Sequence, residues 1–304
     1  MCIGVVIMNA LVRAQTILYK NELSALERSV CSVAAAVKLS REKGGLVEFA
    51  EIAFGDASPE PILNDEIIND WTAKYGNEVK ISYTIFGFNS GTSKGQNILF
   101  RDCTAPYLMI YNPDIVVSPN YFLEMMPVFE RYENVGMVEA RQTPLEHPKF
   151  FDPKTGEQIW GAMACVIVPS KVYSELSGLD EENFFMYCDD VDFSWRVRLS
   201  GRKVIYQPSA VVFHGHRLDS KGGHIHTEAE LYYSAESSLF MAYKWSCKEW
   251  LDEVIKQCAV GTKYQQDALR EFMRRKNEGT LPRQLDPDHK IAYFKNGCYS
   301  RHRY

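Results

Sequence analysis

YLMIYNPD, at residues 107–114, is the stretch that points most directly to the fold class of this 304-residue chain. Its uninterrupted apolar run is typical of a strand buried on both faces, and Asn-Pro-Asp ends that run abruptly. The carboxyl ends of strands are where α/β sheets place ligands, and an aspartate there can bind a hard cation that also holds phosphate oxygens. An Asx-type turn closed by proline explains the same tripeptide when it is taken alone.

Outward from this strand, strand-like and helix-like segments alternate through the first two-thirds of the chain, which is the pattern of an α/β layered domain. The glycine-punctuated stretch 87–97 is expected to be a loop that leads into a short helix at 98–103. The polar, proline-containing stretch 143–158 is expected to be a loop near an acceptor. The other expected strands are 10–19, 49–54, 79–86, 135–141, 160–169 and 203–213, and the other expected helices are 22–40 and 67–76.

Composition shifts near residue 225, and this shift predicts two parts, 1–225 and 226–304. In the second part, apolar residues fall in register on a helix face within 228–258, and a second amphipathic helix is expected at 262–276. The predicted fold class is therefore α/β, a Rossmann-like and mostly parallel sheet with flanking helices, plus a C-terminal helical extension that is basic and aromatic. Its basic residues are typical of a solvated helix face, and contact with anionic lipid is the alternative.

Bulk properties exclude several classes of protein. The formal charge of -5 argues against nucleic acid as a partner, since that role normally shows as a basic excess. The apolar run 3–12 is far shorter than the ~20 residues needed to span a bilayer, and it has no clear signal-peptide flanks. The eight cysteines include no C-x-x-C pair. They are expected to be reduced core residues of a cytoplasmic protein.

Asp189, Asp190 and Asp192 form the strongest local cluster, within MYCDDVDFSWRVRLSGRKVIYQPSAVVFHGH (186–216). Neighbouring carboxylates repel one another unless a cation, a helix N-terminus or a proton relieves the repulsion. The simpler interpretation is an acidic first turn of a helix, paired with the arginines that follow. His214, after the last predicted strand, is placed to reach the same sheet edge as the Asn-Pro-Asp turn, although a lone histidine is more often structural.

Taken together, these segments resemble the family-two type of GT-A glycosyltransferases, especially the rhamnosyltransferase-like branch. Single pieces are unspecific, and it is their common order over about 12–216 that carries the resemblance. The matching pieces are YKNE (19–22), GDAS (55–58), the Asn-x-Gly…Gly-x-Asn stretch (89–97), YNPD (111–114), WGAMACVIVP (160–169), LDEENFFMYCDDVDF (179–193) and FHGH (213–216). The resemblance implies the GT-A fold and the transfer of a sugar from a nucleotide diphosphate to a hydroxyl.

The resemblance also implies roles for the matched residues. Asp190 corresponds to the general base and Asp189 to the residue before it. Asp114 corresponds to the metal-binding member of a DxD-like motif, and His214 to a further metal or diphosphate ligand. The implied cofactor is Mg²⁺ or Mn²⁺. The implied set around the nucleotide, the sugar and the acceptor is Tyr19, Glu22, Asp56, Asn89, Gly95, Asn97, Asn112, Trp160 and Gly161.

The chain departs from the family pattern at several positions. Gly55 stands where many relatives carry an aspartate that contacts the base, and Asn112 replaces a carboxylate, which makes the nucleotide a partner in holding the cation. Asp192 is expected to cap a helix or to pair with the arginine four residues later. His224 and His226 form a second His-x-His pair, for which a loop over the sugar donor is expected and a metal site is the alternative.

The sequence thus predicts an inverting glycosyltransferase of bacterial polysaccharide synthesis, cytoplasmic or peripheral at the inner face of the membrane. dTDP-rhamnose is the favoured donor, a UDP-hexose or UDP-galactofuranose is second, and the acceptor is a glycan or a lipid-linked hydroxyl. A nucleotidyltransferase is an alternative, although ILYKNELSALE (17–27) lacks the glycine-rich, basic phosphate loop such enzymes usually need. A degenerate, non-catalytic sugar-binding subunit is the other alternative, kept open by Gly55 and Asn112.

Overall fold

A computed structural model describes residues 10–215, 227–295 and 297–304 of the chain. The described strands are β1 (Val12–Leu18), β2 (Ala50–Asp56), β3 (Val79–Ile85), β4 (Tyr107–Tyr111), β5 (Ile115–Val117), β6 (Val135–Thr143), β7 (Glu157–Gln158), β8 (Cys165–Pro169) and β9 (Lys203–His214). The described helices are α1 (Leu23–Glu42), α2 (Asp65–Tyr75), α3 (Gly91–Phe100), α4 (Tyr121–Met125), α5 (Pro127–Arg131), α6 (Ser170–Glu175), α7 (Asp189–Leu199), α8 (Glu228–Lys244), α9 (Lys248–Ala259) and α10 (Lys263–Glu278).

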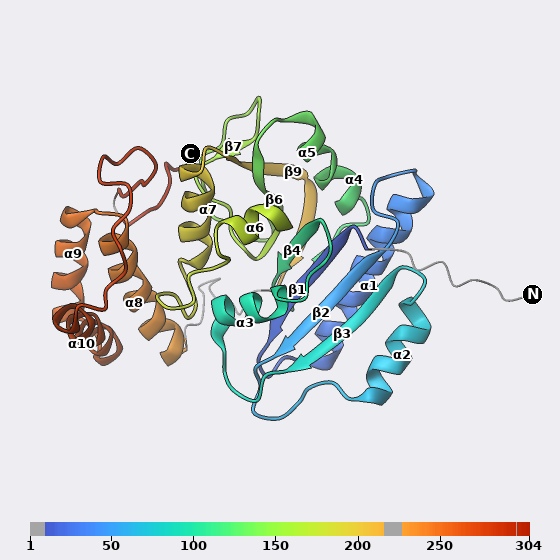
Figure 1. Ribbon diagram of the computed structural model, residues 1–304, viewed down its shortest axis with the longest axis horizontal. Coiled ribbons are helices and arrows are strands. Elements are labelled where there is room, and N and C mark those ends of the chain that lie inside the picture. Colours follow the sequence, from blue (N-terminus) through green and yellow to red (C-terminus); the bar gives the residue numbers. More distant parts are fainter. Residues whose placement is uncertain (1–9, 216–226, 296) are drawn as a thin grey trace, which may run out of the picture.

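One sheet runs through the first part of the chain in the order β3-β2-β1-β4-β8-β6-β9-β5, and β7 pairs with β9. The strands β3, β2, β1 and β4 are mutually parallel. β8 is antiparallel to both β4 and β6, which themselves run in one direction, and β6 is parallel to β9. The predicted α/β class with flanking helices is confirmed (Figure 1). Because the winding reverses between β1 and β4, a ligand crevice is expected at their carboxyl ends.

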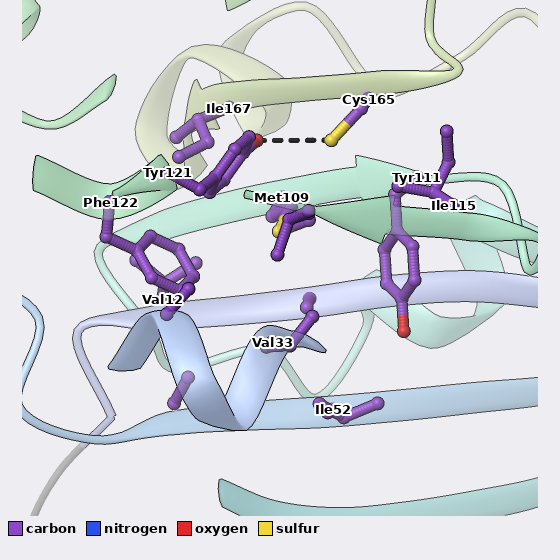
Figure 2. Close-up of a cluster of buried hydrophobic side chains, with 14 of the residues drawn as sticks. Val12, Val33, Ile52, Met109, Tyr111, Ile115, Tyr121, Phe122, Cys165 and Ile167 are labelled. Carbon is purple, nitrogen blue, oxygen red and sulfur yellow. Dashed lines mark hydrogen bonds between the residues drawn. The ribbon is translucent and has the colours of Figure 1, made fainter. Parts of the chain in front are cut away.

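Helices cover both faces of this sheet. α1, α2, α4 and α5 contribute to the core on one face, and α3, α6 and α7 to the core on the other. Side chains of β4 alternate between the two cores, as successive residues of a strand do: Met109 and Tyr111 lie on the α1 side. Figure 2 shows this side, where the Cys165 thiol of β8 donates a hydrogen bond of 3.2 Å to the Tyr121 hydroxyl of α4.

The C-terminal helices pack beside α7 (Figure 1). Trp195 of α7 meets Trp245 edge to face, with ring centroids 5.1 Å apart, and both belong to one apolar cluster with residues of α8, α9 and α10. Capping boxes begin α8, at Thr227, and α10, at Thr262. The extension therefore shares a core with the sheet domain, and the boundary predicted near residue 225 lies outside the described residues.

Several predicted element boundaries are wrong. The helical pattern within 228–258 is divided between α8 and α9, because Ser246 adopts a left-handed conformation with φ 58°. The stretch expected as a loop at 87–97 contains the start of α3, which begins at Gly91. The strand expected at 160–169 begins only at Cys165, and the residues before it form a loop.

Two further expectations can be compared with the described residues. Cys165 and Cys258 are buried, as predicted, but Cys31 and Cys298 are exposed and do not belong to the core. Within the described part of the chain, no helix is both long and apolar enough to cross a membrane.

Candidate active site

Strand pairing brings Asp114 and His214 together at one edge of the sheet. β5 is antiparallel to β9, with Ile115 opposite His214, so the residue before β5 lies beside the end of β9. His214 Nε2 is 3.6 Å from Asp114 Oδ1 and 3.2 Å from Asn112 Nδ2. The Asp114 side chain is 35% exposed and the His214 side chain 13%. This group is therefore accessible from solvent at the end of β4, beside the topological switch point.

Gln142 of β6 orients His214. Its Oε1 atom lies 2.9 Å from His214 Nδ1 and accepts the proton carried there. In the neutral imidazole, the lone pair is then on Nε2, where it accepts from the Asn112 side-chain amide at 3.2 Å. A metal ligand needs this same tautomer, and a cation bound at Nε2 would replace the Asn112 hydrogen bond. Sequence reasoning missed Gln142, because a single glutamine near the end of a strand carries no recognisable signal.

The residues present fit part of a divalent cation site. A carboxylate and a neutral imidazole are both ligands of divalent metals. Among the residues that the structure describes, no three Asp, Glu, His or Cys side chains are grouped so as to hold a metal. The protein therefore offers a partial ligand set, which oxygens of a diphosphate and of water are suited to complete.

Three of the predicted nucleotide-binding residues lie exposed on loops at the carboxyl ends of the parallel strands. Tyr19 and Glu22 follow β1, and Glu22 makes no capping hydrogen bond to α1 although it stands at its start. Asn89 follows β3. The turn after β1 is anchored from the neighbouring strand, because the Lys20 backbone N–H donates to the Ser58 hydroxyl at 2.9 Å. The Tyr19 and Glu22 side chains can therefore face a ligand, whereas Asn89 Oδ1 accepts a hydrogen bond from the Gly91 N–H at 3.3 Å.

Asp56 and Gly95 are placed differently from the prediction. Asp56 is fully buried, and its carboxylate accepts hydrogen bonds from the Ser58 and Ile62 backbone N–H groups, each at 2.8 Å, and from the Tyr83 hydroxyl. It orders the loop after β2 and has no face left for a nucleotide. Gly95 is a packing residue, since a Cβ atom there would lie 2.8 Å from Ile17 Cδ1.

Asn97 is also engaged within the protein. Its Nδ2 donates to the Leu179 carbonyl and to Glu181, at 2.8 and 2.7 Å. Its Oδ1 accepts from the Tyr173 hydroxyl and the Leu179 N–H, at 2.7 and 2.9 Å. The predicted contact with the nucleotide or sugar is therefore corrected: Asn97 fixes the turn that precedes the acidic cluster.

The acidic cluster occupies the first turn of α7. Tyr187 and Cys188 both adopt left-handed conformations, with φ 66° and 57°, so the chain turns sharply into the helix at Asp189. Such conformations are costly for residues other than glycine and are often found at functional sites. The turn presents the acidic side chains at a helix N-terminus, where a negative charge is favoured.

Asp192 belongs to a buried ion pair network. It is fully buried, and Arg196 Nε lies 2.7 Å from one of its oxygens, which confirms the predicted pairing. Its other oxygen accepts from Lys244 Nζ at 2.6 Å and from Trp245 Nε1 at 3.0 Å. Burial favours the neutral acid, but the two cations outweigh burial and hold the pKa of Asp192 below its usual range. Asp192 therefore joins α7 to α8.

Asp189 and Asp190 have the opposite electrostatic character. Burial raises the pKa of Asp190 to about 6, and the charge of Lys149 opposes that rise. Burial, followed by the charge of Asp190, raises the pKa of Asp189 to about 7. Asp189 is buried, whereas Asp190 is half-buried. Carboxylates whose pKa values lie near neutrality are suited to proton transfer, and Asp190 is the more accessible of the two.

The loop 160–163 forms a floor beside Asp190. The Gly161 N–H donates to the Ser194 hydroxyl at 3.1 Å, and that hydroxyl donates to the Asp190 carbonyl at 2.7 Å. Gly161 has Met137 Cε and Glu139 Cβ 3.1 and 3.2 Å from the position a Cβ would take, so a side chain does not fit easily. Trp160 is buried, and its indole N–H has no hydrogen-bond partner in the described structure. The predicted group of Trp160, Gly161 and the Asp189–Asp190 pair is thus assembled in space.

Known proteins resemble the chain in its fold and in a short segment of its sequence. No family model matches the chain. Over 63 residues the chain is 36% identical to the N-acetylglucosaminyl-diphospho-decaprenol L-rhamnosyltransferase of Mycobacterium tuberculosis, a segment that covers 21% of this chain and 20% of that protein. The similarity in sequence thus spans a fifth of the curated relative's length.

Solved structures resemble the chain over most of its length. GalNAc-T7 with UDP, GalNAc and Mn²⁺ gives a TM-score of 0.62 at 13% identity, covering 90% of this chain and 56% of that one. The mannosyltransferase PcManGT from Pyrobaculum calidifontis, in complex with GDP-Man and Mn²⁺, gives 0.52 at 13% identity, covering 90% and 85%. S. aureus TarS gives 0.53 at 12% identity, covering 89% and 54%.

These structures are GT-A glycosyltransferases, and the chain has their fold. The partial similarity in sequence, over 63 residues, is to a rhamnosyltransferase. Both statements agree with the resemblance found in the sequence. At this level of identity the structures establish the fold, and the reaction, the sugar and the acceptor are matters of proposal.

Proposed function

We propose that the chain is a glycosyltransferase that moves a sugar from a nucleoside diphosphate to an acceptor hydroxyl with inversion. One observation carries the proposal. Asp190, which is half-buried in the first turn of α7 beside the loop 160–163, has a pKa raised to about 6. A carboxylate with this pKa is anionic at neutral pH and is a better proton acceptor than an ordinary aspartate. The degenerate, non-catalytic alternative has no need for such a group.

The site has two groups of residues, and we propose a different role for each. Asp190 accepts the proton of the incoming hydroxyl, while Trp160 and Gly161 line the floor on which the sugar and the acceptor lie. Asp114 and His214 would hold the divalent cation, which when bound stabilises the negative charge of the departing diphosphate. With the base and the leaving group on opposite faces of the sugar ring, the product is inverted.

The remaining features fit this proposal. We propose that residues 1–225 form the catalytic domain and 226–304 an extension that packs against it. The acceptor would be a glycan or a lipid-linked hydroxyl, and the protein would be cytoplasmic or peripheral at the inner face of the membrane. The His224–His226 pair, for which a loop over the donor is expected, lies outside the described residues.

The proposed donor is dTDP-rhamnose, with a UDP-sugar second. The YKNE turn and the GDASPEP loop support it, as does the name of the rhamnosyltransferase that matches part of the chain. In a panel of dTDP-, UDP- and GDP-sugars, we expect the largest thermal stabilisation with a pyrimidine nucleotide, because a ligand that binds only the folded state raises stability. We also expect slow release of free sugar and nucleoside diphosphate.

The same panel separates the alternatives. A nucleotidyltransferase would instead cleave the sugar nucleotide between its two phosphates, giving a nucleoside monophosphate and a sugar 1-phosphate. A degenerate subunit would bind a sugar nucleotide without any hydrolysis. Greatest stabilisation by GDP-mannose would contradict the proposed donor.

Nucleotide binding is expected to depend on a divalent cation through Asp114. Calorimetry of dTDP with Mn²⁺ or Mg²⁺ should show at least ~10-fold weaker binding in Asp114→Ala and after chelation, because a metal ligand has been removed. Gln142→Leu should weaken metal-dependent binding by about 10–100-fold, as loss of a residue that orients a histidine ligand does. Asp288→Ala, a control at an exposed carboxylate, should bind like the unaltered protein. Equal affinity with and without chelator would remove the metal from the mechanism.

A further inference from the structure

Lys149, from the loop 143–158, is buried beneath the proposed sugar floor. Its ammonium lies 2.7 Å from each carboxylate oxygen of Glu139 on β6, and only 6% and 3% of the two side chains are exposed. The same ammonium lies 4.0 Å from the ring centroid of Trp160. This burial excludes Lys149 from direct contact with a diphosphate, and its charge is instead fixed in place inside the protein.

The Glu139–Lys149 pair is connected to Asp190 through two successive backbone groups. The Ala162 N–H donates to Glu139 at 2.9 Å. The preceding Gly161 N–H donates to the Ser194 hydroxyl at 3.1 Å, and that hydroxyl donates to the Asp190 carbonyl at 2.7 Å. The pair therefore lies under the same loop that contacts the first turn of α7. The titratable groups that act on Asp190 or are acted on by it are Lys149, Glu139, Asp189, Cys188 and Tyr299. Lys149 supplies a positive charge within this group, and it acts on the pKa of Asp190 more strongly than Glu139 does.

The main chain around Lys149 is held by the C-terminal segment. The Phe150 N–H donates to the Arg301 carbonyl at 2.9 Å, and the Arg303 N–H donates to the Pro148 carbonyl at 2.8 Å. The Arg303 guanidinium donates to the Lys149 carbonyl at 3.1 Å and also pairs with Glu146. Lys149 is therefore fixed at its ammonium by β6 and at its backbone by the C-terminal segment.

A buried ion pair adds little to the stability of the fold, because the desolvation of two charges offsets much of their attraction. An apolar pair of similar size often stabilises the fold equally well. A fixed cation next to a carboxylate, however, favours the anion and restricts its orientation. We propose that Lys149 is the positioning residue of the base Asp190, keeping it anionic and aimed at the acceptor side of the floor. This inference rests on the proposed function for the reaction, but the charge effect itself is measurable without any substrate.

The substitution Lys149→Met tests the inference by two independent measurements. Carboxyl ¹³C NMR of aspartate-labelled protein, with the Asp190 signal identified by its loss in Asp190→Asn, reports the titration directly. We expect the midpoint to rise by about 1 pH unit, the lower end of what a nearby opposite charge does to a carboxyl group. The acid limb of kcat/KM should rise by the same amount, and activity should recover at high pH, because only the anion of Asp190 accepts a proton.

Controls separate this effect from simple loss of structure. Lys154→Met removes an exposed lysine from the same loop and should leave both titrations unchanged. If Lys149→Met does not fold, the double variant Glu139→Gln with Lys149→Met removes both charges and keeps similar shapes. The midpoint should still rise in the double variant, by less, because Lys149 outweighs Glu139 at Asp190.

Three outcomes would overturn the inference: an unmoved Asp190 titration in whichever of these variants folds, a loss of rate that is equal at every pH, or weaker nucleotide binding in place of a shifted pH profile. Failure of the unaltered protein to transfer or hydrolyse any sugar would count against the proposed function, while the NMR titration would still decide the role of Lys149.

Discussion

Replacing Asp190 by Asn is expected to lower turnover by about 10²–10⁴-fold, the usual contribution of a general base, while nucleotide affinity stays nearly unchanged. Asparagine keeps the shape of the side chain and much of its hydrogen bonding, including acceptance from the Val191 N–H at 2.8 Å. What it lacks is the ability to accept a proton. The group around Asp114 and His214, which is proposed to hold the cation and the diphosphate, is at a different strand end and is left intact.

Asp189→Asn is the matched comparison, since Asp189 is adjacent in sequence and also has a raised pKa. It is more buried than Asp190, and we expect it to affect turnover less. We would compare the two variants by their single-turnover rates and their dTDP affinities, measured at the same pH. If Asp189→Asn abolished transfer and Asp190→Asn did not, the base would be Asp189. If neither mattered, the proposed inverting mechanism would have no base.

Sequence patterns predicted the parts of the site that are fixed by local chemistry. An apolar strand ending in Asn-Pro-Asp must expose its aspartate at a sheet edge, and a histidine after a strand has the same constraint. What the pattern does not contain is the three-residue strand β5, whose pairing with β9 sets the Asp114–His214 distance. The proximity of these two residues therefore followed from family resemblance rather than from periodicity.

Matching letters of a motif do not distinguish a ligand contact from a supporting role. Gly95 and Asn97 occupy motif positions, yet one permits α3 to approach β1 and the other fixes the turn at Leu179. Gln142 and Lys149 contact residues on other elements, and no pattern in the neighbouring sequence predicts those contacts. The break between α8 and α9 was hidden for a similar reason, since the apolar stripe continues through it and only the left-handed Ser246 interrupts the helix.

Asp192→Asn is expected to reduce the free energy of unfolding by about 3–5 kcal/mol, the cost of removing one partner from a buried charge network. The variant leaves Arg196 and Lys244 with less compensation in a buried site, although Lys244 retains Asp180 at 2.7 Å. Urea unfolding followed by tryptophan fluorescence measures the change, because Trp195 and Trp245 report on this interface. The rate per folded molecule should stay within about threefold, since Asp192 has no solvent-exposed surface and serves no proposed chemical step.

The stability lost in Asp192→Asn is expected to depend on pH. The folded-state pKa of Asp192 is held below its usual range, so the carboxylate adds stability above the unfolded value of about 3.9 and loses that contribution as pH falls through the folded pKa. The difference between the unaltered chain and Asp192→Asn should therefore be largest near neutral pH and should shrink below about pH 4. Asp252→Asn, at an exposed pair with Lys248, should leave the free energy of unfolding nearly unchanged, because solvent screens that pair. Two outcomes would show that the main role of the network is not to join α7 to α8. One is equal stability of the Asp192→Asn and Asp252→Asn variants, and the other is a ~100-fold loss of rate in folded Asp192→Asn.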